Sequence, residues 1–316
     1  MSGNGTVEVA GVGEGLPIGA APPAHTPGFA HGHEHGHKHG HGGHGHSHGH
    51  KPAEDEWNGE EYIAKPGAKE VALLSADSIF YALQQTGMSR EDTKRIDLLE
   101  VGCGPGMVTD NLVPHFSSIH AIDVSPSMLL TFASRHSNPH ITHSLHFLSP
   151  SSPSEFLTPL LSPLPAEQAR RLQPPHAKYG VAVANLVLHH VDDWAGMMAG
   201  VQGLLVPGGW FVGTEFGREE GERDRVKEAR EIVAAKKREA AGEGAQKYKG
   251  ANQLQPASHG HHIHHNAMTP SEMYTKLKSL GFDEAHAEIR GELKLWPEAP
   301  AVPCLVFWAR TAKEES

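Results

Sequence analysis

The chain has 316 residues and a formal net charge of −10 with histidine counted as neutral, so its overall charge does not favour nucleic acid or anionic lipid as a partner. It contains two cysteines, too few for a disulfide framework, which predicts a reducing compartment. No apolar run approaches membrane-spanning length, and no basic region followed by an apolar core opens the chain, so we expect neither a membrane span nor a secretory leader.

The first 56 residues consist almost entirely of glycine, alanine, proline, histidine and acidic residues. They contain too few large apolar side chains to offset the entropy that a chain loses when it becomes ordered. We therefore predict that residues 1–56 form a disordered tail rich in histidine and glycine. About 260 residues remain, enough for one α/β domain over residues 57–313.

Helical and strand patterns alternate along this domain. Apolar residues at helical spacing predict a helix over 69–86, and a short apolar run over 96–101 predicts a buried strand. Proline after a serine at 125–126 is typical of a helix start. Further strands are expected at 119–124, 145–148, 180–188, 210–215, 284–289 and 302–309, and further helices at 107–113, 166–172, 194–205, within 218–250, and at 269–281.

Strands that alternate with helices at this spacing predict a doubly wound, Rossmann-like sheet of seven mostly parallel strands. The last two strands follow each other with only a loop between them, so we expect them to form an antiparallel pair at one edge. Residues 217–267 are an insertion of charged helix and loop between the fifth strand and the next helix. Their interleaved charges are typical of a solvated helix face.

A glycine-rich turn follows the first predicted strand. Its sequence, from Gly102 to Gly106, lets the backbone turn sharply and approach a ligand without interference from a Cβ atom. Met107 stands where a dinucleotide fingerprint requires its third glycine. Glu100, two residues before the turn, suits a cationic amino group and would repel a pyrophosphate. The alternative is that the glycines serve chain reversal only.

A second carboxylate ends the next strand. Asp123 is placed to accept hydrogen bonds from both hydroxyls of a ribose. With Glu100 at one end and Asp123 at the other, the segment predicts a ligand that combines a positively charged amino-acid head with a ribose.

At these residues the chain resembles a known family. Residues 99–106, 121–128 and 185–191 are similar to successive motifs of class I S-adenosylmethionine-dependent methyltransferases, nearest to the branch that includes quinone-biosynthesis enzymes. Residues 205–209 resemble that family's turn into the fifth strand, and the resemblance covers about residues 60–310. It implies S-adenosylmethionine as cofactor and methyl transfer to the oxygen, carbon or nitrogen of a small molecule, with the acceptor itself left open.

The resemblance also implies a role for individual residues. Asp123 would bind the ribose, Met128 would pack on the adenine, and Asn185 and Leu186 would lie beside the sulfonium carbon. The implied cofactor contacts are Glu100, Gly102, Cys103, Gly104, Gly106, Asp123, Val124, Met128, Asn185 and Leu186.

The chain departs from the family after the third strand. Family members usually carry an acidic residue there that contacts the adenine amine, whereas this sequence has no acid before Glu155. Either Ser149 or a backbone group substitutes, or the adenine is held less tightly.

Two histidines are candidate catalytic residues. His189 and His190 follow the fourth strand, where the carboxyl ends of an open α/β sheet place substrate. Imidazole titrates near neutral pH, so one of them can take a proton from an acceptor hydroxyl. The alternative is that the pair only shapes its loop. We also expect residues 57–62 to fold over the cofactor as a lid, and the resemblance places an acceptor cap at 217–267.

Histidine makes up ten of the twenty residues from 31 to 50. Imidazoles that alternate with glycine can bind Zn²⁺ or Ni²⁺ without forming one defined site, and His31, His33, His35 and His37 are examples. The alternative is incidental low complexity. A second cluster at 259–265 is placed to line the mouth of the active site.

Other classes of function stay open at this stage. A metal-binding or interaction protein could keep the fold without turnover, although both carboxylates of the cofactor pattern are intact. A nicotinamide-dependent oxidoreductase is disfavoured by Glu100 and Met107. We expect a cytoplasmic protein, with the nucleus as an alternative, and the sequence leaves the oligomeric state open.

Overall fold

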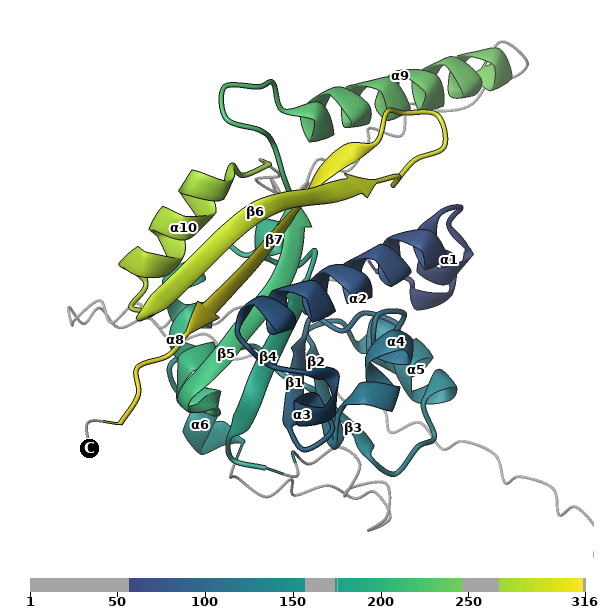
Figure 1. Ribbon diagram of the computed structural model, residues 1–316. Coiled ribbons are helices and arrows are strands. Elements are labelled where there is room, and N and C mark those ends of the chain that lie inside the picture. The colour runs from purple at the N-terminus through teal and green to yellow at the C-terminus, as the bar shows by residue number, and fades with distance from the viewer. Residues whose placement is uncertain (1–56, 157–173, 175, 246–266, 315–316) are drawn as a thin grey trace, which may run out of the picture. The chain divides into compact units, whose positions relative to one another are not determined.

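The structure is a computed structural model that describes residues 57–156, 174, 176–245 and 267–314 (Figure 1). The predicted tail over 1–56 and the predicted helix over 166–172 lie outside the described residues, as does the histidine cluster at 259–265. Of the insertion over 217–267, the structure describes 217–245 and residue 267.

A single sheet of seven strands organises the domain, in the order β3-β2-β1-β4-β5-β7-β6. Neighbouring strands from β3 to β5 pair in parallel, and β7 is antiparallel to both β5 and β6. This confirms the predicted doubly wound, mostly parallel sheet with an antiparallel pair at one edge. The strands are β1 (Asp97–Val101), β2 (Ser118–Asp123), β3 (Ile141–Leu145), β4 (Tyr179–Asn185), β5 (Leu205–Phe216), β6 (Glu284–Leu293) and β7 (Val302–Arg310).

Helices cover both faces of the sheet (Figure 1). One apolar cluster joins the sheet to α2, α4 and α9, and a second joins the opposite face to α8 and α10. The helices are α1 (Gly59–Ala64), α2 (Ala68–Gln85), α3 (Arg90–Thr93), α4 (Thr109–Leu112), α5 (Pro126–Arg135), α6 (Ser152–Glu155), α8 (Trp194–Leu204), α9 (Arg225–Ala245) and α10 (Pro270–Ser279), with 3-10 turns at Val113–His115 and Leu188–His190.

The helix starts follow the sequence signals closely. Ser125 caps α5 by accepting a hydrogen bond from the Met128 N–H at 3.1 Å. Thr269 and Glu272 form a reciprocal capping box at the start of α10. Both caps confirm the predicted starts of these helices.

The third strand lies earlier in the chain than predicted. β3 occupies Ile141–Leu145, whereas the apolar run that suggested a strand over 145–148 mostly follows it. β3 is an edge strand and is only partly buried, so it does not need an apolar sequence. Its hydroxyls at Thr142 and Ser144 instead contact the ring of His120 on β2, at 2.7 and 3.0 Å.

The boundaries of β4 and β5 also differ from the prediction. β4 ends at Asn185 rather than at 188 because Leu186 takes a φ of 53°, a left-handed conformation that strands do not continue through. β5 begins at Leu205 rather than at 210, and Pro207-Gly208-Gly209 forms a bulge within it.

Candidate active site

The three glycines of the turn after β1 all have positive φ, but they serve different purposes. A Cβ atom on Gly102 would lie 2.3 Å from Cγ2 of Val187, and one on Gly106 would lie 2.2 Å from Nε2 of His136. Those two glycines therefore make room for protein side chains. A Cβ on Gly104 would have nothing within 4 Å, so Gly104 alone of the three borders open space that a ligand can enter.

Asp123 is fixed beside that open space. Its Oδ2 accepts a hydrogen bond from the Gly104 N–H at 2.7 Å, and its Oδ1 accepts one from the Ser125 N–H at 2.9 Å. The carboxylate thus links the glycine turn to the start of α5, and it is 8% exposed. The structure therefore brings together Gly104 and Asp123, which the sequence analysis assigned to one ligand.

Glu100 lies beneath the turn and is buried. Its Oε2 accepts a hydrogen bond from Oγ1 of Thr109, in the first turn of α4, at 2.7 Å. Burial raises the pKa of Glu100 to about 8; the negative charges of Asp110 and Asp123 add to the rise, and the Thr109 hydroxyl opposes it. The carboxyl is therefore mostly protonated at neutral pH. Thr109 was not predicted as part of the site; a hydroxyl residue in the first turn of the helix after the glycine turn is the sequence signal that could have indicated it.

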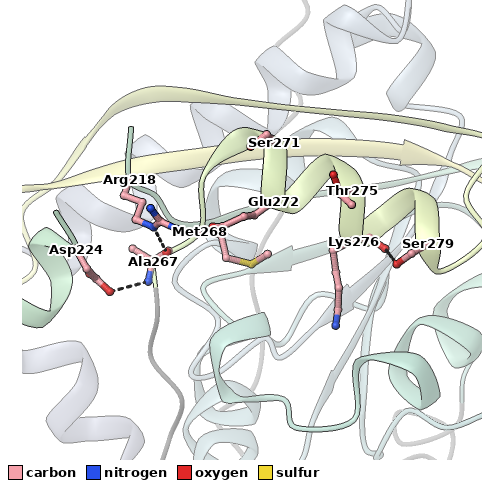
Figure 2. A pocket seen from close by; sticks show the side chains of 9 residues that line it. All are labelled: Arg218, Asp224, Ala267, Met268, Ser271, Glu272, Thr275, Lys276 and Ser279. Carbon is pink, nitrogen blue, oxygen red and sulfur yellow. Dashed lines mark hydrogen bonds and ion pairs between the residues drawn. The ribbon is translucent and has the colours of Figure 1, made fainter. Parts of the chain in front are cut away.

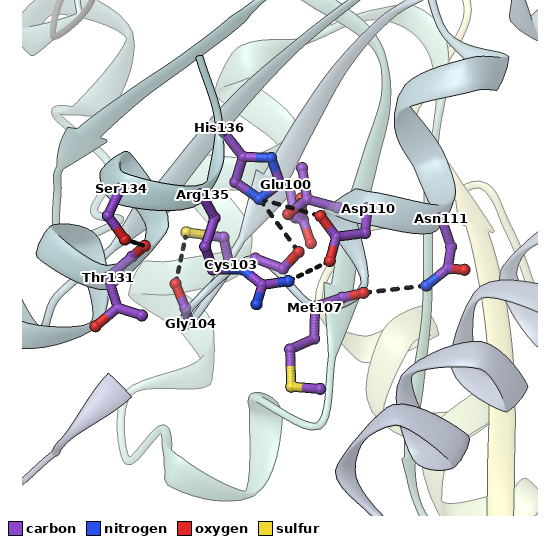
Figure 3. A network of polar contacts seen from close by, with 12 residues as sticks. Glu100, Cys103, Gly104, Met107, Asp110, Asn111, Thr131, Ser134, Arg135 and His136 are labelled. Carbon is purple, nitrogen blue, oxygen red and sulfur yellow. Dashed lines mark hydrogen bonds and ion pairs between the residues drawn. The ribbon is translucent and has the colours of Figure 1, made fainter. Parts of the chain in front are cut away.

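A polar network holds the turn against α5 (Figure 3). Nε2 of His136 lies 3.3 Å from the carbonyl oxygen of Gly106 and 3.7 Å from Oδ1 of Asp110. Arg135 forms an ion pair with the same Asp110. Cys103 also lies in this region, where burial raises the pKa of its thiol well above the usual range. A buried, protonated thiol is a poor nucleophile, which argues against a nucleophilic role for Cys103.

Apolar side chains gather at the ends of β2 and β3. Val124 is 61% exposed and Phe147 is 70% exposed, both in the residues directly after these strands. The His146 N–H donates to the Asp123 carbonyl at 3.1 Å, which holds the two segments together. Met128, predicted to pack on an adenine, is buried at the start of α5.

Glu155, the first acid after the third strand, lies in the short helix α6. The hydroxyl oxygens of Ser149 and Ser151 lie 2.8 Å apart, and the Ser151 hydroxyl donates to Oε1 of Glu155 at 2.5 Å. Glu155 is the last residue of α6 and half-exposed. Ser149, the candidate substitute, and Glu155 therefore belong to one hydrogen-bond network.

The ends of β4 and β5 are joined by two side-chain contacts. Oδ1 of Asn185 accepts a hydrogen bond from Oγ1 of Thr214 at 2.5 Å. One residue further along β5, Oε1 of Glu215 lies 2.6 Å from Nδ1 of His189, and Oε2 accepts from the His189 N–H at 3.2 Å. The sequence analysis treated Glu215 only as the end of a strand, since nothing local marks it as a partner of His189.

The predicted catalytic histidines lie together but differ in their surroundings. Their ring centroids are 3.9 Å apart, and Phe216 packs on the other side of His189 at 4.4 Å. The edge of Trp57 meets His190 at 5.2 Å. Burial lowers the pKa of His190 to about 4, helped by the neighbouring His189 ring and the Arg230 guanidinium and opposed by Glu215, so His190 is neutral at physiological pH.

A cavity lies along α10, and no residue of the glycine turn lines it (Figure 2). Its volume is about 610 Å³. Nε of Arg218 donates to the Ala267 carbonyl at 3.0 Å, and Asp224 accepts from the Ala267 N–H at 3.2 Å. None of the predicted site residues lines it. The lining residues are Arg218, Asp224, Ala267, Met268, Ser271, Glu272, Thr275, Lys276 and Ser279.

The described residues contain no group of three or more histidine, cysteine, aspartate or glutamate side chains arranged to hold a metal ion. They also contain no helix that is both long enough and apolar enough to cross a membrane. His31, His33, His35 and His37, as well as the second histidine cluster, lie outside this part of the chain.

The chain was compared with solved structures. It is similar to DhpI in complex with SAH, at 15% identity and a TM-score of 0.41, over 77% of this chain and 96% of that one. It is also similar to the CurJ carbon methyltransferase, at 16% identity and a TM-score of 0.47, over 80% of this chain and 58% of that one. Magnesium protoporphyrin IX methyltransferase from Synechocystis PCC 6803 matches at 12% identity and a TM-score of 0.42, over 78% and 84% of the two chains.

Sequence comparison gives the family. Uncharacterized methyltransferases of Mycobacterium bovis and Mycobacterium tuberculosis are 27% identical to the chain over 119 residues, which are 38% of this chain and 50% of each relative. The chain therefore spans about half the length of the curated relatives that it matches. A family model described as a methyltransferase domain matches residues 78–286, well over half of the chain. The chain belongs to the class I S-adenosylmethionine-dependent methyltransferase family.

Proposed function

We propose that this protein binds S-adenosylmethionine at the carboxyl ends of β1 and β2 and methylates a small-molecule acceptor at the ends of β4 and β5. The observation that carries the proposal is the position of Asp123, whose carboxylate is held by two backbone amides beside the open space at Gly104. The two amides orient this carboxylate beside the turn, and carboxylate oxygens are the acceptors that the hydroxyls of a ribose require.

The other parts of the cofactor also find suitable groups. Glu100 lies beneath the turn, where a bound ammonium group would favour its ionised form. Val124 and Phe147 offer exposed apolar surface for the adenine. Glu155 is half-exposed and accepts a hydrogen bond from the Ser151 hydroxyl. It is the first acid after the third strand and therefore the candidate partner of the adenine amine. The positions of these side chains support a cofactor that combines an amino-acid group, a ribose and a purine.

When bound, S-adenosylmethionine supplies a methyl group made electrophilic by its sulfonium. The protein then has to orient the acceptor and exclude water. Asn185 and Leu186 suit the first task because a hydrogen bond to Thr214 fixes the Asn185 side chain and the Leu186 N–H donates to the Thr214 carbonyl at 2.9 Å. His189 is the candidate general base for an acceptor that has to lose a proton.

Calorimetry with S-adenosylhomocysteine tests the proposal. The full chain should bind it, and Asp123→Ala should weaken binding by about 1–3 kcal/mol because the ribose hydroxyls lose their acceptor. Asp97→Ala is the matched control: this carboxylate lies at the opposite end of β1, where it accepts from the Ser118 hydroxyl at 2.6 Å. Its affinity should stay at the wild-type value.

Two further measurements complete this test. Asp123→Asn keeps the shape of the side chain and should also weaken binding, so a folding defect in Asp123→Ala does not decide the outcome. Urea unfolding of each variant reports its stability separately. Tight NADH binding by the wild-type protein, with no heat from S-adenosylhomocysteine, would overturn the proposed function. An unchanged affinity in both Asp123 variants would remove this residue from the site.

A further inference from the structure

We propose that His136, directly after the last residue of α5, is a positioning residue for the cofactor. By fixing the glycine turn at Gly106, it holds Gly104 and Asp123 in the arrangement that binds S-adenosylmethionine, and it acts through the turn rather than on the ligand. The inference rests on the cofactor binding proposed above and adds a residue to that site. His136 lies 30 positions after Gly106, outside the motifs that carry the family resemblance.

The ring of His136 packs directly on the turn. It is 8% exposed, and its centroid lies 4.3 Å from that of the Phe132 ring, one helical turn earlier in α5. A Cβ atom on Gly106 would lie 2.2 Å from Nε2 of His136 and 2.8 Å from Cδ2 of Phe132. The two rings therefore occupy the space that Gly106 leaves by lacking a side chain.

The surroundings of Nε2 determine where the proton of the imidazole lies. Nε2 is 3.3 Å from the carbonyl oxygen of Gly106 and 3.7 Å from Oδ1 of Asp110 (Figure 3). Both oxygens are acceptors, so a neutral ring carries its proton on Nε2 and donates it to the Gly106 carbonyl. Burial lowers the pKa of His136, although Asp110 and the Gly106 carbonyl oppose this, so the ring is neutral at physiological pH.

The Gly106 carbonyl is the point through which the ring acts on the site. It accepts a second hydrogen bond from the Asp110 N–H at 3.1 Å, so the ring and α4 hold it together. The Gly106 N–H donates to the Cys103 carbonyl at 3.1 Å, which closes the turn. The peptide between Cys103 and Gly104 is then held at both ends, because the Gly104 N–H donates to Asp123 at 2.7 Å. A shift of Gly106 would therefore shift the peptide that orients the Asp123 carboxylate.

α5 is thereby attached to the cofactor site at both of its ends. At its start, the Ser125 N–H donates to Oδ1 of Asp123 at 2.9 Å. At its end, His136 holds the Gly106 carbonyl. A helix of ten residues is about 15 Å long and stiff, so it fixes the distance between these two attachments. The turn and the carboxylate assigned to the ribose are therefore arranged before the ligand arrives, which reduces the entropy lost on binding.

The first test needs no ligand. Nitrogen NMR of the imidazole rings in the full chain reports which ring nitrogen carries the proton, and the signals of His136 are assigned by their loss in His136→Gln. We expect the Nε2–H form in the wild-type protein at a pH above neutral. A ring with a bare Nε2 would overturn the inference, because it could not donate to the Gly106 carbonyl.

The second test separates the donor from the shape of the side chain. His136→Leu removes the donor. In His136→Gln the amide nitrogen is as many bonds from Cα as Nε2 is, so it can reach the Gly106 carbonyl, whereas the amide nitrogen of His136→Asn is one bond closer to Cα and falls short. Calorimetry should show an affinity for S-adenosylhomocysteine that is about 3- to 10-fold lower in His136→Leu and His136→Asn, the loss expected for one neutral hydrogen bond. His136→Gln should keep an affinity near the wild-type value.

His115→Leu is the matched control. The His115 ring also packs on a phenylalanine, with its centroid 4.7 Å from that of Phe80, but among the described residues it forms no hydrogen bond with the glycine turn. This variant should bind S-adenosylhomocysteine as the wild type does. Urea unfolding of each variant gives its folded fraction, so that each affinity refers to folded protein. If His136→Leu does not fold, the comparison of His136→Gln with His136→Asn decides the outcome.

A double-mutant cycle tests the route through the carboxylate. If His136 acts on the ligand through Asp123, the loss of affinity in His136→Leu should be smaller when Asp123→Asn is also present. Losses that simply add would contradict this route.

The wild-type affinity separates the two proposals. If the wild-type protein does not bind S-adenosylhomocysteine, the proposed function fails, and the role of His136 fails with it. If the wild type binds, and folded His136→Leu and His136→Asn bind equally tightly, His136 only supports the fold and the proposed function stands.

Discussion

Individual residues in the site carry an energetic cost that folding alone does not explain. Glu100 is a buried carboxyl whose pKa is raised to about 8 by burial, although the Thr109 hydroxyl binds it. Leu186 is a non-glycine residue with a φ of 53° at the end of β4, a conformation that costs about 1 kcal/mol. Such costs tend to concentrate where a ligand is bound. Both residues belong to the set implied by the family resemblance.

Glu100 makes the stability of the free protein depend on pH. Its pKa is raised above the ordinary value of 4.5, so the folded state holds a proton that the unfolded state has lost between pH 4.5 and about 8. The contribution of Glu100 to the free energy of unfolding is therefore fully present below pH 4.5 and is lost as the pH rises to about 8. We expect Glu100→Gln to remove this loss, measured as the difference in urea unfolding free energy from wild type across that range. A difference that does not change with pH would contradict the raised pKa.

Gly104 and Gly106 should respond differently to the same substitution. Gly106→Ala should destabilise the fold, because its Cβ would meet His136 at 2.2 Å. Gly104→Ala meets no protein atom within 4 Å and should cost only about 1 kcal/mol of backbone strain. Its methyl group would nevertheless occupy the proposed ligand space. Calorimetry should therefore show a clear loss of S-adenosylhomocysteine affinity in folded Gly104→Ala, and normal affinity would place the ligand elsewhere.

At the scale of elements, helix starts and strand ends supply most of the site. α5 begins at the cap Ser125, whose own N–H donates to Asp123, so one residue links the helix start to the carboxylate that we propose binds the ribose. The 3-10 turn after β4 carries both histidines, and β5 delivers Glu215 to His189 across the sheet. Parallel pairing of β4 and β5 brings their carboxyl ends to one edge.

The caps of α5 and α10 form a matched pair for a test. Ser125→Ala and Thr269→Ala each remove a side-chain acceptor from a backbone N–H, and each should cost about 1 kcal/mol of stability. The Ser125 N–H that donates to Asp123 stays in Ser125→Ala, but the lost cap loosens the helix start that holds this N–H in place. Thr269 has no such link, so only Ser125→Ala should weaken binding of S-adenosylhomocysteine. Equal effects of the two variants on binding would show that the α5 cap has no special link to the site.

At the scale of the whole molecule, ligand binding should stabilise the fold. A ligand that binds only the folded state at about 100 times its Kd adds about 2.7 kcal/mol to the unfolding free energy. We expect this gain with S-adenosylhomocysteine in the wild-type protein and in Asp97→Ala, and a smaller gain in Asp123→Asn at the same ligand concentration. Chemical denaturation with and without ligand measures it. An equal gain in all three proteins would contradict the role of Asp123.

Local sequence patterns determined much of the architecture. The order of strands and helices, the caps of α5 and α10, the glycine turn and the acids at 100 and 123 all follow from spacing within about a dozen residues. The predicted strand boundaries were wrong where the surroundings of a strand, rather than its local sequence pattern, determine where it begins and ends. β3 is polar because it lies at an edge, and β4 stops early because Leu186 changes its backbone conformation.

The glycine turn and its two carboxylates were therefore evident from the sequence by itself, because strand alternation and glycine spacing are properties of neighbouring residues. Only the tertiary structure decided what each group contacts. His136 meets Gly106 across 30 positions, and Glu215 meets His189 across 26. Parallel strands are far apart in the sequence because a crossover connection separates each pair. Contacts between such segments therefore cannot be predicted from neighbouring residues.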